Sequence, residues 1–392
     1  MKKKRICVLG SNSGRNAGDA AILSSIIDNF SALDRNLVFE VPTTHCGYVK
    51  KAFPAKDVRP VSIMPWTGSI RLLGLSTMAS IMRSDVVLIT DGIIFDVKLF
   101  NPLFNFLILL AFLVPFARLC RKKVICFCVG VGPLDTGAGR RLARMVCNLS
   151  EAVMVREESS ASLVRDIGVR EELIEIYADA AFVNIPAPPE RADEILREKG
   201  IAPEEKVIGV NVNSYIDLWL RKSERLDRAT FTTEFARGLD LVIDRLGARV
   251  ACVITQVMDR TIADEILAAM KHGERVPVIS NEEYDNREIM AVMGKLEIFV
   301  GMRLHSLILA SAMSAPVLGL AYAPKVRHFM KMLGTEDRIF ELDRTTGEAL
   351  SEAIISSWEE REGNLAKVRP VMDDVKKRAR AAYRDAHDRY LS

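Results

Sequence analysis

The sequence predicts an α/β fold made of two Rossmann-like, doubly wound domains that face a cleft. Its 392 residues suffice for two ordinary domains. Short apolar runs without period-two alternation are separated by longer amphipathic stretches, which is typical of fully buried parallel strands joined by helices. Prolines 186, 188, 189 and 203 then cluster around a charged stretch. We interpret that cluster as the link between the domains.

The N-terminal domain is expected at residues 1–188. Its candidate strands are Arg5–Leu9, Leu37–Val41, Val86–Thr90, Val124–Val129, Ala152–Val155 and Leu173–Tyr177. Its candidate helices are Ala20–Phe30, Ile70–Met82, Pro102–Leu119, Gly139–Leu149 and Glu158–Ile167. This strand–helix alternation favours a parallel sheet.

The C-terminal domain is expected at residues 204–345 and repeats the alternation. Its candidate strands are Val207–Val212, Arg249–Ile254, Val276–Val278, Ile298–Val300 and Val317–Leu320. Its candidate helices are Thr230–Leu246, Thr261–Lys271, Asn286–Met293, Ser306–Met313 and Pro324–Leu333. Residues 346–392 form a charged helical tail, which fits either a solvated terminal helix or a surface for a membrane or another anionic partner.

Composition excludes several classes of protein. Lys and Arg exceed Asp and Glu by only three charges, so a dedicated nucleic-acid binder is not indicated. The seven cysteines have no zinc-binding spacing and an odd count, which indicates free thiols in a reducing, cytoplasmic compartment. No His or Cys set has metal-ligand spacing, and we predict no metal and no cofactor.

The apolar run Phe106–Ala117 is too short to span a membrane, which takes about 20 residues. Arg118, Arg121, Lys122 and Lys123 follow it directly. One interpretation is a helix packed on the sheet. The other is a peripheral membrane contact with a basic collar, which would place the protein at the inner face of the membrane.

Two glycine-containing loops follow predicted strands. In the loop Gly10–Asp19 the spacing is neither a dinucleotide fingerprint nor a phosphate loop, but its glycines, including Gly18, allow a ligand close to the backbone, and the helix start offers free N–H groups to an anion. Asp19 either caps the following helix or faces the cleft. In the second loop, Gly130 and Gly132 permit a tight turn near a ligand.

Charged side chains occur at further strand ends. Arg156 is placed to bind a phosphate or carboxylate, or else forms an interdomain ion pair. Asp179 either caps a turn or faces the cleft. Arg303 and His305 flank a helix start, where an anion can be held beside a proton carrier. Lys325, in the first turn of the next helix, opposes the helix dipole and so hints at function. We expect one cleft to gather these side chains, with Asp19 and Asp179 as its carboxylates. Its three fixed cations imply a small, multiply charged anionic substrate.

Six motifs, in this order, resemble the polysaccharide pyruvyl transferases over residues 5–335. The motifs are Asn16-Ala-Gly-Asp19-Ala-Ala-Ile22, Val129-Gly-Val-Gly-Pro-Leu134, Val155-Arg-Glu-Glu-Ser-Ser160, Ala178-Asp-Ala-Ala-Phe182, Gly301-Met-Arg-Leu-His-Ser306 and Tyr322-Ala-Pro-Lys325. The resemblance implies a fold similar to the glycosyltransferase B type. It also implies transfer of pyruvate from phosphoenolpyruvate to a sugar of a cell-surface polysaccharide precursor, as a ketal.

The resemblance also implies roles for individual residues. His305 would be the proton donor, and Asp179 or Asp19 would take the hydroxyl proton. The implied substrate-binding residues are Arg156, Arg303, Lys325, Asn16, Gly18, Gly130, Gly132 and Ser306. The partners would be a small-molecule donor and a sugar acceptor, lipid-linked or nucleotide-linked. The oligomeric state is left open.

Two other functions fit the same residues. One is a nucleotide-sugar glycosyltransferase, with Asn211 to Tyr215 lining the nucleotide site. The other is a non-catalytic binding protein of polysaccharide biosynthesis. The family commonly has a Gly-Gly-Gly-like turn where this chain has Thr90-Asp-Gly-Ile-Ile-Phe-Asp96, and this departure supports the second alternative.

Overall fold

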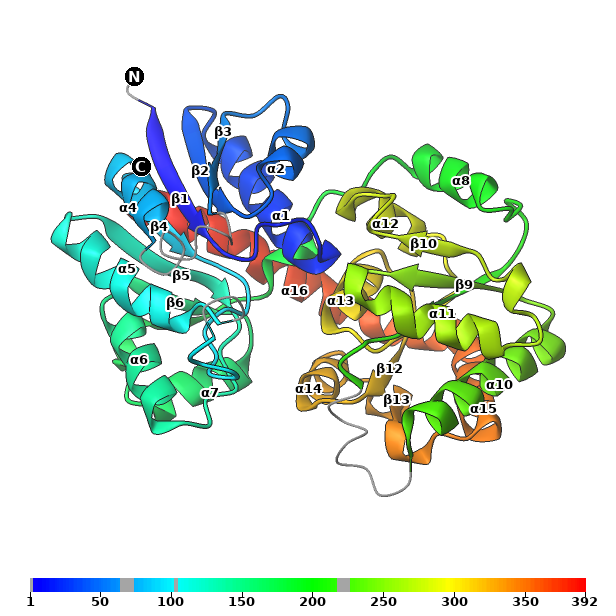
Figure 1. Ribbon diagram of the computed structural model, residues 1–392. Coiled ribbons are helices and arrows are strands. Elements are labelled where there is room, and N and C mark those ends of the chain that lie inside the picture. The colour runs from blue at the N-terminus through cyan, green and yellow to red at the C-terminus, as the bar shows by residue number, and fades with distance from the viewer. Residues whose placement is uncertain (1–2, 64–73, 102–104, 217–225) are drawn as a thin grey trace. The chain divides into compact units, whose positions relative to one another are not determined.

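The computed structural model describes residues 3–63, 74–101, 105–216 and 226–392. The chain divides into two compact units (Figure 1). The first contains residues 1–14, 19–184 and 375–392, and the second contains 15–18 and 185–374. Each is a parallel α/β sheet with helices on both faces, which confirms the predicted fold class.

The sheet of the first unit has seven strands in the order β3-β2-β1-β4-β5-β6-β7, all parallel. The strands are β1 (Lys4–Leu9), β2 (Leu37–Thr43), β3 (Val58–Ser62), β4 (Val86–Ile89), β5 (Lys123–Val129), β6 (Ala152–Val155) and β7 (Ile174–Ile176). Six of them match the predicted strands. The edge strand β3 was not predicted, because it is only partly buried and carries Arg59 and Pro60.

Helices cover both faces of this sheet. They are α1 (Ala17–Leu33), α2 (Cys46–Ala52), α4 (Leu75–Arg83), α5 (Leu107–Leu119), α6 (Gly137–Asn148) and α7 (Glu158–Asp166). The first part of two predicted helices, at 70–73 and 102–104, lies outside the described residues. Alternate strand residues such as Val124 and Cys126 share one core with α4 to α7. On the other face Phe127 packs against Phe30 of α1.

The second unit has a six-stranded sheet in the order β10-β9-β8-β11-β12-β13, again all parallel. The strands are β8 (Val207–Asn211), β9 (Arg249–Ile254), β10 (Val278–Ser280), β11 (Ile298–Gly301), β12 (Val317–Ala321) and β13 (Ile339–Glu341). Strand β10 lies two residues beyond its predicted start at Val276. The three-residue edge strand β13 was not predicted.

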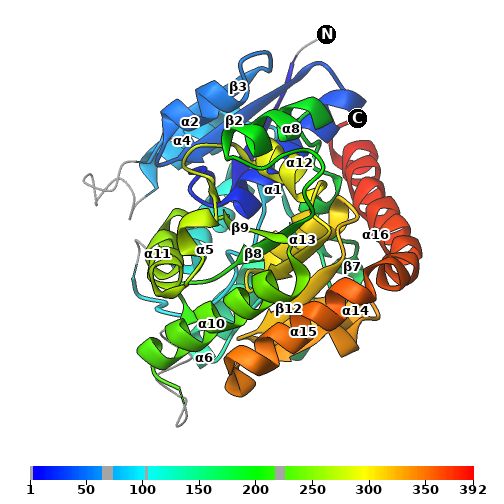
Figure 2. The same ribbon diagram turned by 90° about the vertical axis from the view of Figure 1, so that its right-hand side faces the viewer.

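The helices of the second unit are α8 (Pro189–Glu198), α10 (Arg228–Leu246), α11 (Arg260–Ala269), α12 (Asn286–Met293), α13 (Leu304–Ala312), α14 (Pro324–Met332) and α15 (Gly347–Glu359). Helices α10 to α14 begin within two residues of the five predicted helices, whereas α8 was not predicted and α15 lies in the predicted tail. Helices α10, α11 and α15 share one core with the sheet (Figure 2). Helix α8 occupies part of the predicted linker and is held to α12 by an ion pair of 2.8 Å between Arg191 and Glu288.

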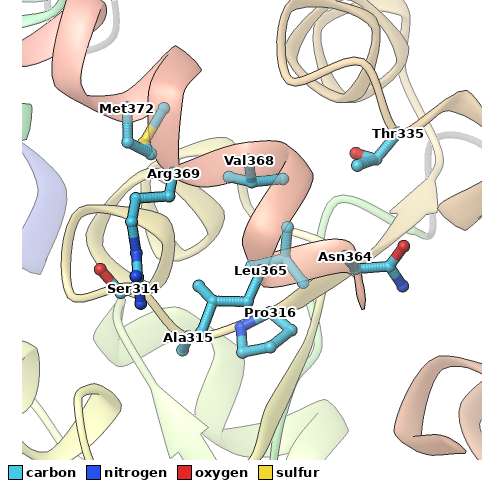
Figure 3. Close-up of a pocket in the computed structure, with 10 residues that line it drawn as sticks. Ser314, Ala315, Pro316, Thr335, Asn364, Leu365, Val368, Arg369 and Met372 are labelled. Carbon is cyan, nitrogen blue, oxygen red and sulfur yellow. The ribbon is translucent and has the colours of Figure 1, made fainter. Parts of the chain in front are cut away.

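The sequence predicts that the charged tail is separate from the two domains, but the structure shows that it is part of both units. Residues 346–392 form α15 and α16 (Arg361–Tyr390), and α16 contributes to both units. In the second unit its residues Leu365, Val368 and Met372 line a small cavity with Ala315 and Pro316 (Figure 3). In the first unit Tyr383 is buried against Phe30 and Phe127, with its hydroxyl 2.8 Å from that of Ser25.

No helix in the described ranges is long and apolar enough to cross a membrane. Helix α5 contains most of the predicted apolar run and spans 13 residues. Its residues Leu110, Leu113 and Val114 are buried in the core of the first unit. The packed-helix interpretation therefore holds for one face of α5.

Candidate functional site

Three predicted residues of the first unit, together with Asp91, lie at the carboxyl ends of neighbouring strands. Asp91 follows β4, Gly130 follows β5, Arg156 follows β6, and Asp179 follows β7. Because the four strands are parallel and adjacent, these residues share one edge of the sheet. That edge is where open α/β sheets bind their ligands.

Arg156 and Asp179 form a buried ion pair. The Nη1 of Arg156 donates to Oδ2 of Asp179 at 2.8 Å, and the two side chains are 11% and 3% exposed. The other carboxylate oxygen accepts the N–H of Ala181 at 2.9 Å. Asp179 thus caps a turn and pairs with Arg156, and both residues belong to one unit rather than to two. Burial opposes the charge of the guanidinium, but Asp179 and Glu157 outweigh it and raise the pKa of Arg156.

Gly130 and Gly132 have different structural roles. A Cβ at Gly130 would lie 2.5 Å from Nη2 of Arg156, so only glycine leaves room for the guanidinium. Gly132 has a φ of +107°, which favours glycine, and its N–H donates to the carbonyl of Ile94 at 2.8 Å. The predicted turn is therefore present, and Gly130 is the position next to a charged group.

Asp91 is a buried carboxyl group that is not among the predicted site residues. It is 3% exposed, and its Oδ2 accepts the N–H of Ser11 at 2.6 Å. Its φ of +64° is a conformation that glycine favours and Asp tolerates. Burial and the negative charge of Asp19 raise the pKa of Asp91 well above its usual range, although the Ser11 N–H opposes the shift. A polar residue directly after a buried strand is the sequence signal for this group.

Asn16, rather than Asp19, caps helix α1. The Oδ1 of Asn16 accepts the N–H of Gly18, the second residue of the helix, at 2.9 Å. Asp19 lies in the first turn and is half-buried. Its effect on Asp91 places its charge within electrostatic reach of the carboxyl edge of the first sheet.

Residues 15–18 pack onto the second unit although the flanking chain belongs to the first. The N–H of Ala17 donates to the carbonyl of Thr255 at 2.7 Å, and Asn16 contacts the side chain of Gln256 at 3.3 Å. Gly18 lies against His305, because a Cβ at Gly18 would be 2.3 Å from the His305 Cβ. The loop and the histidine are therefore direct neighbours.

Arg303 is held by a buried carboxylate that sequence reasoning missed. Its Nη2 donates to Oδ1 of Asp259 at 2.6 Å, and its Nε donates to the other oxygen. Asp259 is fully buried, and Arg303 is 9% exposed. A bidentate pair fixes the plane of the guanidinium. The only sequence signal is an acidic residue five positions after the end of strand β9.

Asn211 connects the end of β8 to the start of α13. Its Oδ1 accepts the N–H of Arg303 and the hydroxyl of Ser306, each at 3.1 Å, and its Nδ2 donates to the carbonyl of Val253 at 2.8 Å. Asn211 is fully buried. Asn211 and Ser306 therefore hold the Arg303–His305 turn in position through these hydrogen bonds.

His305 and Lys325 begin adjacent helices of the second unit. His305 is the second residue of α13 and is half-buried. Lys325 is exposed in the first turn of α14, with its Nζ 5.6 Å from the ring centroid of Tyr322. The Arg303 guanidinium lies 5.6 Å from the ring centroid of Tyr215, which is a second cation–π contact.

The predicted site residues thus fall into two groups. Asp19, Gly130, Gly132, Arg156 and Asp179 belong to the first unit, and Asn16, Gly18, Arg303, His305, Ser306 and Lys325 belong to the second. Their convergence in one cleft stays a prediction. The cavity of Figure 3 contains none of them. Across the described residues, no group of three or more His, Cys, Asp or Glu side chains is placed to hold a metal.

Residues 16–324 match the family described as polysaccharide pyruvyl transferase. The chain is 21% identical to the amylovoran biosynthesis protein AmsJ of Erwinia amylovora, over 93% of this chain and 95% of that protein.

Solved structures share the two-unit architecture at low sequence identity. HepE of Anabaena, in complex with UDP-glucose, has a TM-score of 0.62 at 14% identity and covers 98% of both chains. MnaA of S. aureus, solved with UDP, has a TM-score of 0.67 at 13% identity, covering 99% of this chain and 97% of that one. These likenesses support the predicted fold similarity to glycosyltransferases of the B type.

Gly18→Ala should destabilise the protein, because the added methyl group meets the rigid Cβ of His305. We expect a loss of about 1–3 kcal/mol in the free energy of unfolding, measured by urea denaturation. Gly363→Ala is the matched control, since Gly363 is also helical and has no atom within 4 Å of its Cβ position. That variant should be neutral or stabilised, as expected from helix propensity. Equal behaviour of the two variants would contradict the contact.

Asp91→Asn should stabilise the protein at pH 7. When folding raises the pKa of a carboxyl group, that group stabilises the folded protein most at pH values below the usual Asp pKa. This contribution falls by about 1.4 kcal/mol per pH unit as the pH rises toward the raised pKa. Asn keeps an acceptor for the Ser11 N–H and tolerates the positive φ. We expect a higher urea midpoint than wild type at pH 7 and a shrinking difference toward pH 4.

The exposed residue Asp135 of the same unit provides the control for this measurement. Asp135→Asn should leave the urea midpoint close to that of wild type at both pH values. If Asp91→Asn were less stable than wild type at pH 7, the raised pKa of Asp91 would be refuted.

Proposed function

The chain belongs to the polysaccharide pyruvyl transferase family, and on that premise we propose that it transfers pyruvate from phosphoenolpyruvate to a sugar of a cell-surface polysaccharide precursor. The product is a ketal that bridges two hydroxyl groups, and phosphate is released. The observation that carries the proposal is the Arg303–His305 turn, in which a fixed guanidinium and a half-buried imidazole begin helix α13 beside the Gly18 backbone.

The donor requires several positive groups, because it carries a phosphate and a carboxylate. In the second unit Arg303, Lys325 and the N-terminal end of α13 supply them. A guanidinium has five N–H groups, and the pair with Asp259 uses two of them, so donors remain for an anion. The pair also fixes the direction in which those donors point. Arg156 would assist from the first unit.

The reaction balances with one acid and one base. His305 donates a proton to the C3 methylene of phosphoenolpyruvate, and C2 becomes electrophilic. One sugar hydroxyl adds to C2 and gives its proton to a carboxylate. The second hydroxyl then forms its bond to C2 while the bond from C2 to the phosphate oxygen breaks, and its proton leaves with the phosphate. The cations stabilise the phosphate as its charge grows.

Asp19 fits the role of base better than Asp179. Asp179 is buried, and its two carboxylate oxygens accept hydrogen bonds from Arg156 and from the backbone N–H of Ala181, so both are already engaged. Asp19 is half-buried in the first turn of α1, directly after the Gly18 that contacts His305. We assign Asp179 to positioning Arg156 instead.

The proposed chemistry needs no cofactor, since the donor itself supplies the pyruvyl group. We expect the protein to act in the cytoplasm, where phosphoenolpyruvate is formed, on an acceptor carried by a nucleotide or a lipid.

His305→Gln should abolish turnover and keep donor binding. We expect phosphate release from phosphoenolpyruvate, measured with lipid-linked and nucleotide-linked sugars, to fall by about 10²–10⁴-fold, which is the usual contribution of a positioned proton donor. The stabilisation of the protein by phosphoenolpyruvate in a thermal shift should persist. His328→Gln, at an exposed histidine of α14, is the control and should keep full activity.

The same measurements separate the alternatives. Stabilisation by UDP and not by phosphoenolpyruvate would overturn the proposal in favour of a nucleotide-sugar glycosyltransferase. Binding of phosphoenolpyruvate without phosphate release from any acceptor would favour a non-catalytic binding protein. Retained turnover in His305→Gln would refute the acid role alone.

A further inference from the structure

Helix α5 presents an apolar face to solvent. Five of its side chains are buried against the sheet, namely Leu107, Leu110, Leu113, Val114 and Ala117. On the opposite side Phe112 is 63% exposed and Leu119 is 82% exposed. Its one charged residue is Arg118. A helix that is apolar on all sides is normally buried on all sides. The outer face of α5 is apolar but is exposed to solvent.

Exposed apolar side chains are concentrated on and around this helix. The described residues include nine large apolar side chains that are exposed, and six of them lie between positions 75 and 119. The six are Leu75, Met82, Val97, Phe100, Phe112 and Leu119. Helix α4 packs beside α5, and its Leu75 and Met82 are seven residues apart and so share one side of that helix. Clustering of this kind marks an interaction surface.

Positive charge lies next to the same patch. Helix α6 packs beside α5 on the same side of the first sheet (Figure 1), and it exposes Arg140, Arg141 and Arg144. Residues 105–148 contain seven Lys or Arg and a single Asp, which is a net charge of +6 in a chain whose total is +3. Neither α5 nor α6 contains an acidic residue.

Two of these cations have acidic partners. Arg118 pairs with Glu151, and Arg140 pairs with Asp166 at 3.0 Å. Both pairs are exposed, with the two arginine side chains 43% and 45% accessible. Exposed pairs contribute little and are readily exchanged, so they do not cancel the attraction of the surface for anions.

We propose that this α5–α6 surface, defined by Phe112, Leu119, Arg118, Arg121 and the three arginines of α6, docks on an anionic phospholipid bilayer. Apolar side chains of such a surface enter the boundary between headgroups and acyl chains, while the cations beside them bind the lipid phosphates. A bilayer therefore binds both the apolar side chains and the cations of this surface.

A second copy of the chain is a poorer partner for the same surface. A two-fold symmetric contact would place the surface against itself and bring two sets of like charges together. A dissolved polyanion would satisfy the arginines and leave Phe112 and Leu119 in water. The bilayer is the partner that matches both the charge and the apolar side chains. This docking does not depend on the proposed pyruvyl transfer.

The test is sedimentation of the full chain with vesicles. We expect binding to vesicles of phosphatidylcholine with about one-third phosphatidylglycerol, little binding to phosphatidylcholine alone, and weaker binding as salt rises. Phe112→Ser and Leu119→Ser should each lower partitioning by about tenfold, since each removes a large apolar group that the bilayer would bury. Arg141→Ala and Arg144→Ala should each lower it by about fivefold.

Leu33→Ser is the matched control, because Leu33 is a 42% exposed leucine at the end of α1 in the same unit. It should bind vesicles as wild type does. Thermal melting of each variant checks that the variant is folded. Absence of binding to the anionic vesicles at low salt would overturn the proposal, as would unchanged binding of Phe112→Ser. A wild-type dimer that Phe112→Ser converts to monomer, with no vesicle binding, would assign the surface to a second copy instead.

Discussion

Every strand pair in both sheets is parallel, so the carboxyl ends of neighbouring strands meet at one edge of each sheet. This constraint gathers chemistry from distant parts of the sequence. Asp179 reaches Arg156 across one strand spacing, and Asn211 reaches Arg303 from the adjacent strand end. In each unit a strand end supplies an arginine and another part of the same unit supplies the acid that holds it. The remaining features of the candidate site follow from these placements.

The two buried ion pairs explain how the loops at strand ends can present cations in fixed positions. A buried charge without a partner is costly, and the partner is expensive to remove, so Arg156 with Asp179 and Arg303 with Asp259 stay in defined orientations. A guanidinium fixed in this way is ready to bind an anion without first losing side-chain entropy. The pairs also reduce the net charge at each edge. For the proposed donor, which carries two anionic groups, the attraction would therefore depend on directed N–H groups and the helix α13 N-terminus more than on a surplus of cations.

Much of the fold could be predicted from the sequence, and the failures have physical causes. Strand β5 is recognisable because its apolar residues form a continuous run, and helix α12 is recognisable because Asp285 is a good helix cap. Both signals are local in the sequence. The edge strands β3 and β13 are not recognisable from the sequence, since partly buried edge strands tolerate polar residues. Asp259 was missed because its importance comes from a partner 44 positions away. Asp91 lies in the stretch that departs from the family pattern, but its burial and the influence of Asp19 appear only in three dimensions.

The sequence by itself determined the class of fold, the strand ends that carry charged residues and the family, because these depend on local composition and short motifs. The tertiary structure decided which charges are paired, that residues 15–18 pack with the second unit, and that the tail helix α16 is part of both units. It also decided that α5 buries one apolar face and exposes the other. The physical reason is that pairing and burial depend on which surfaces meet, and a linear pattern does not contain that information.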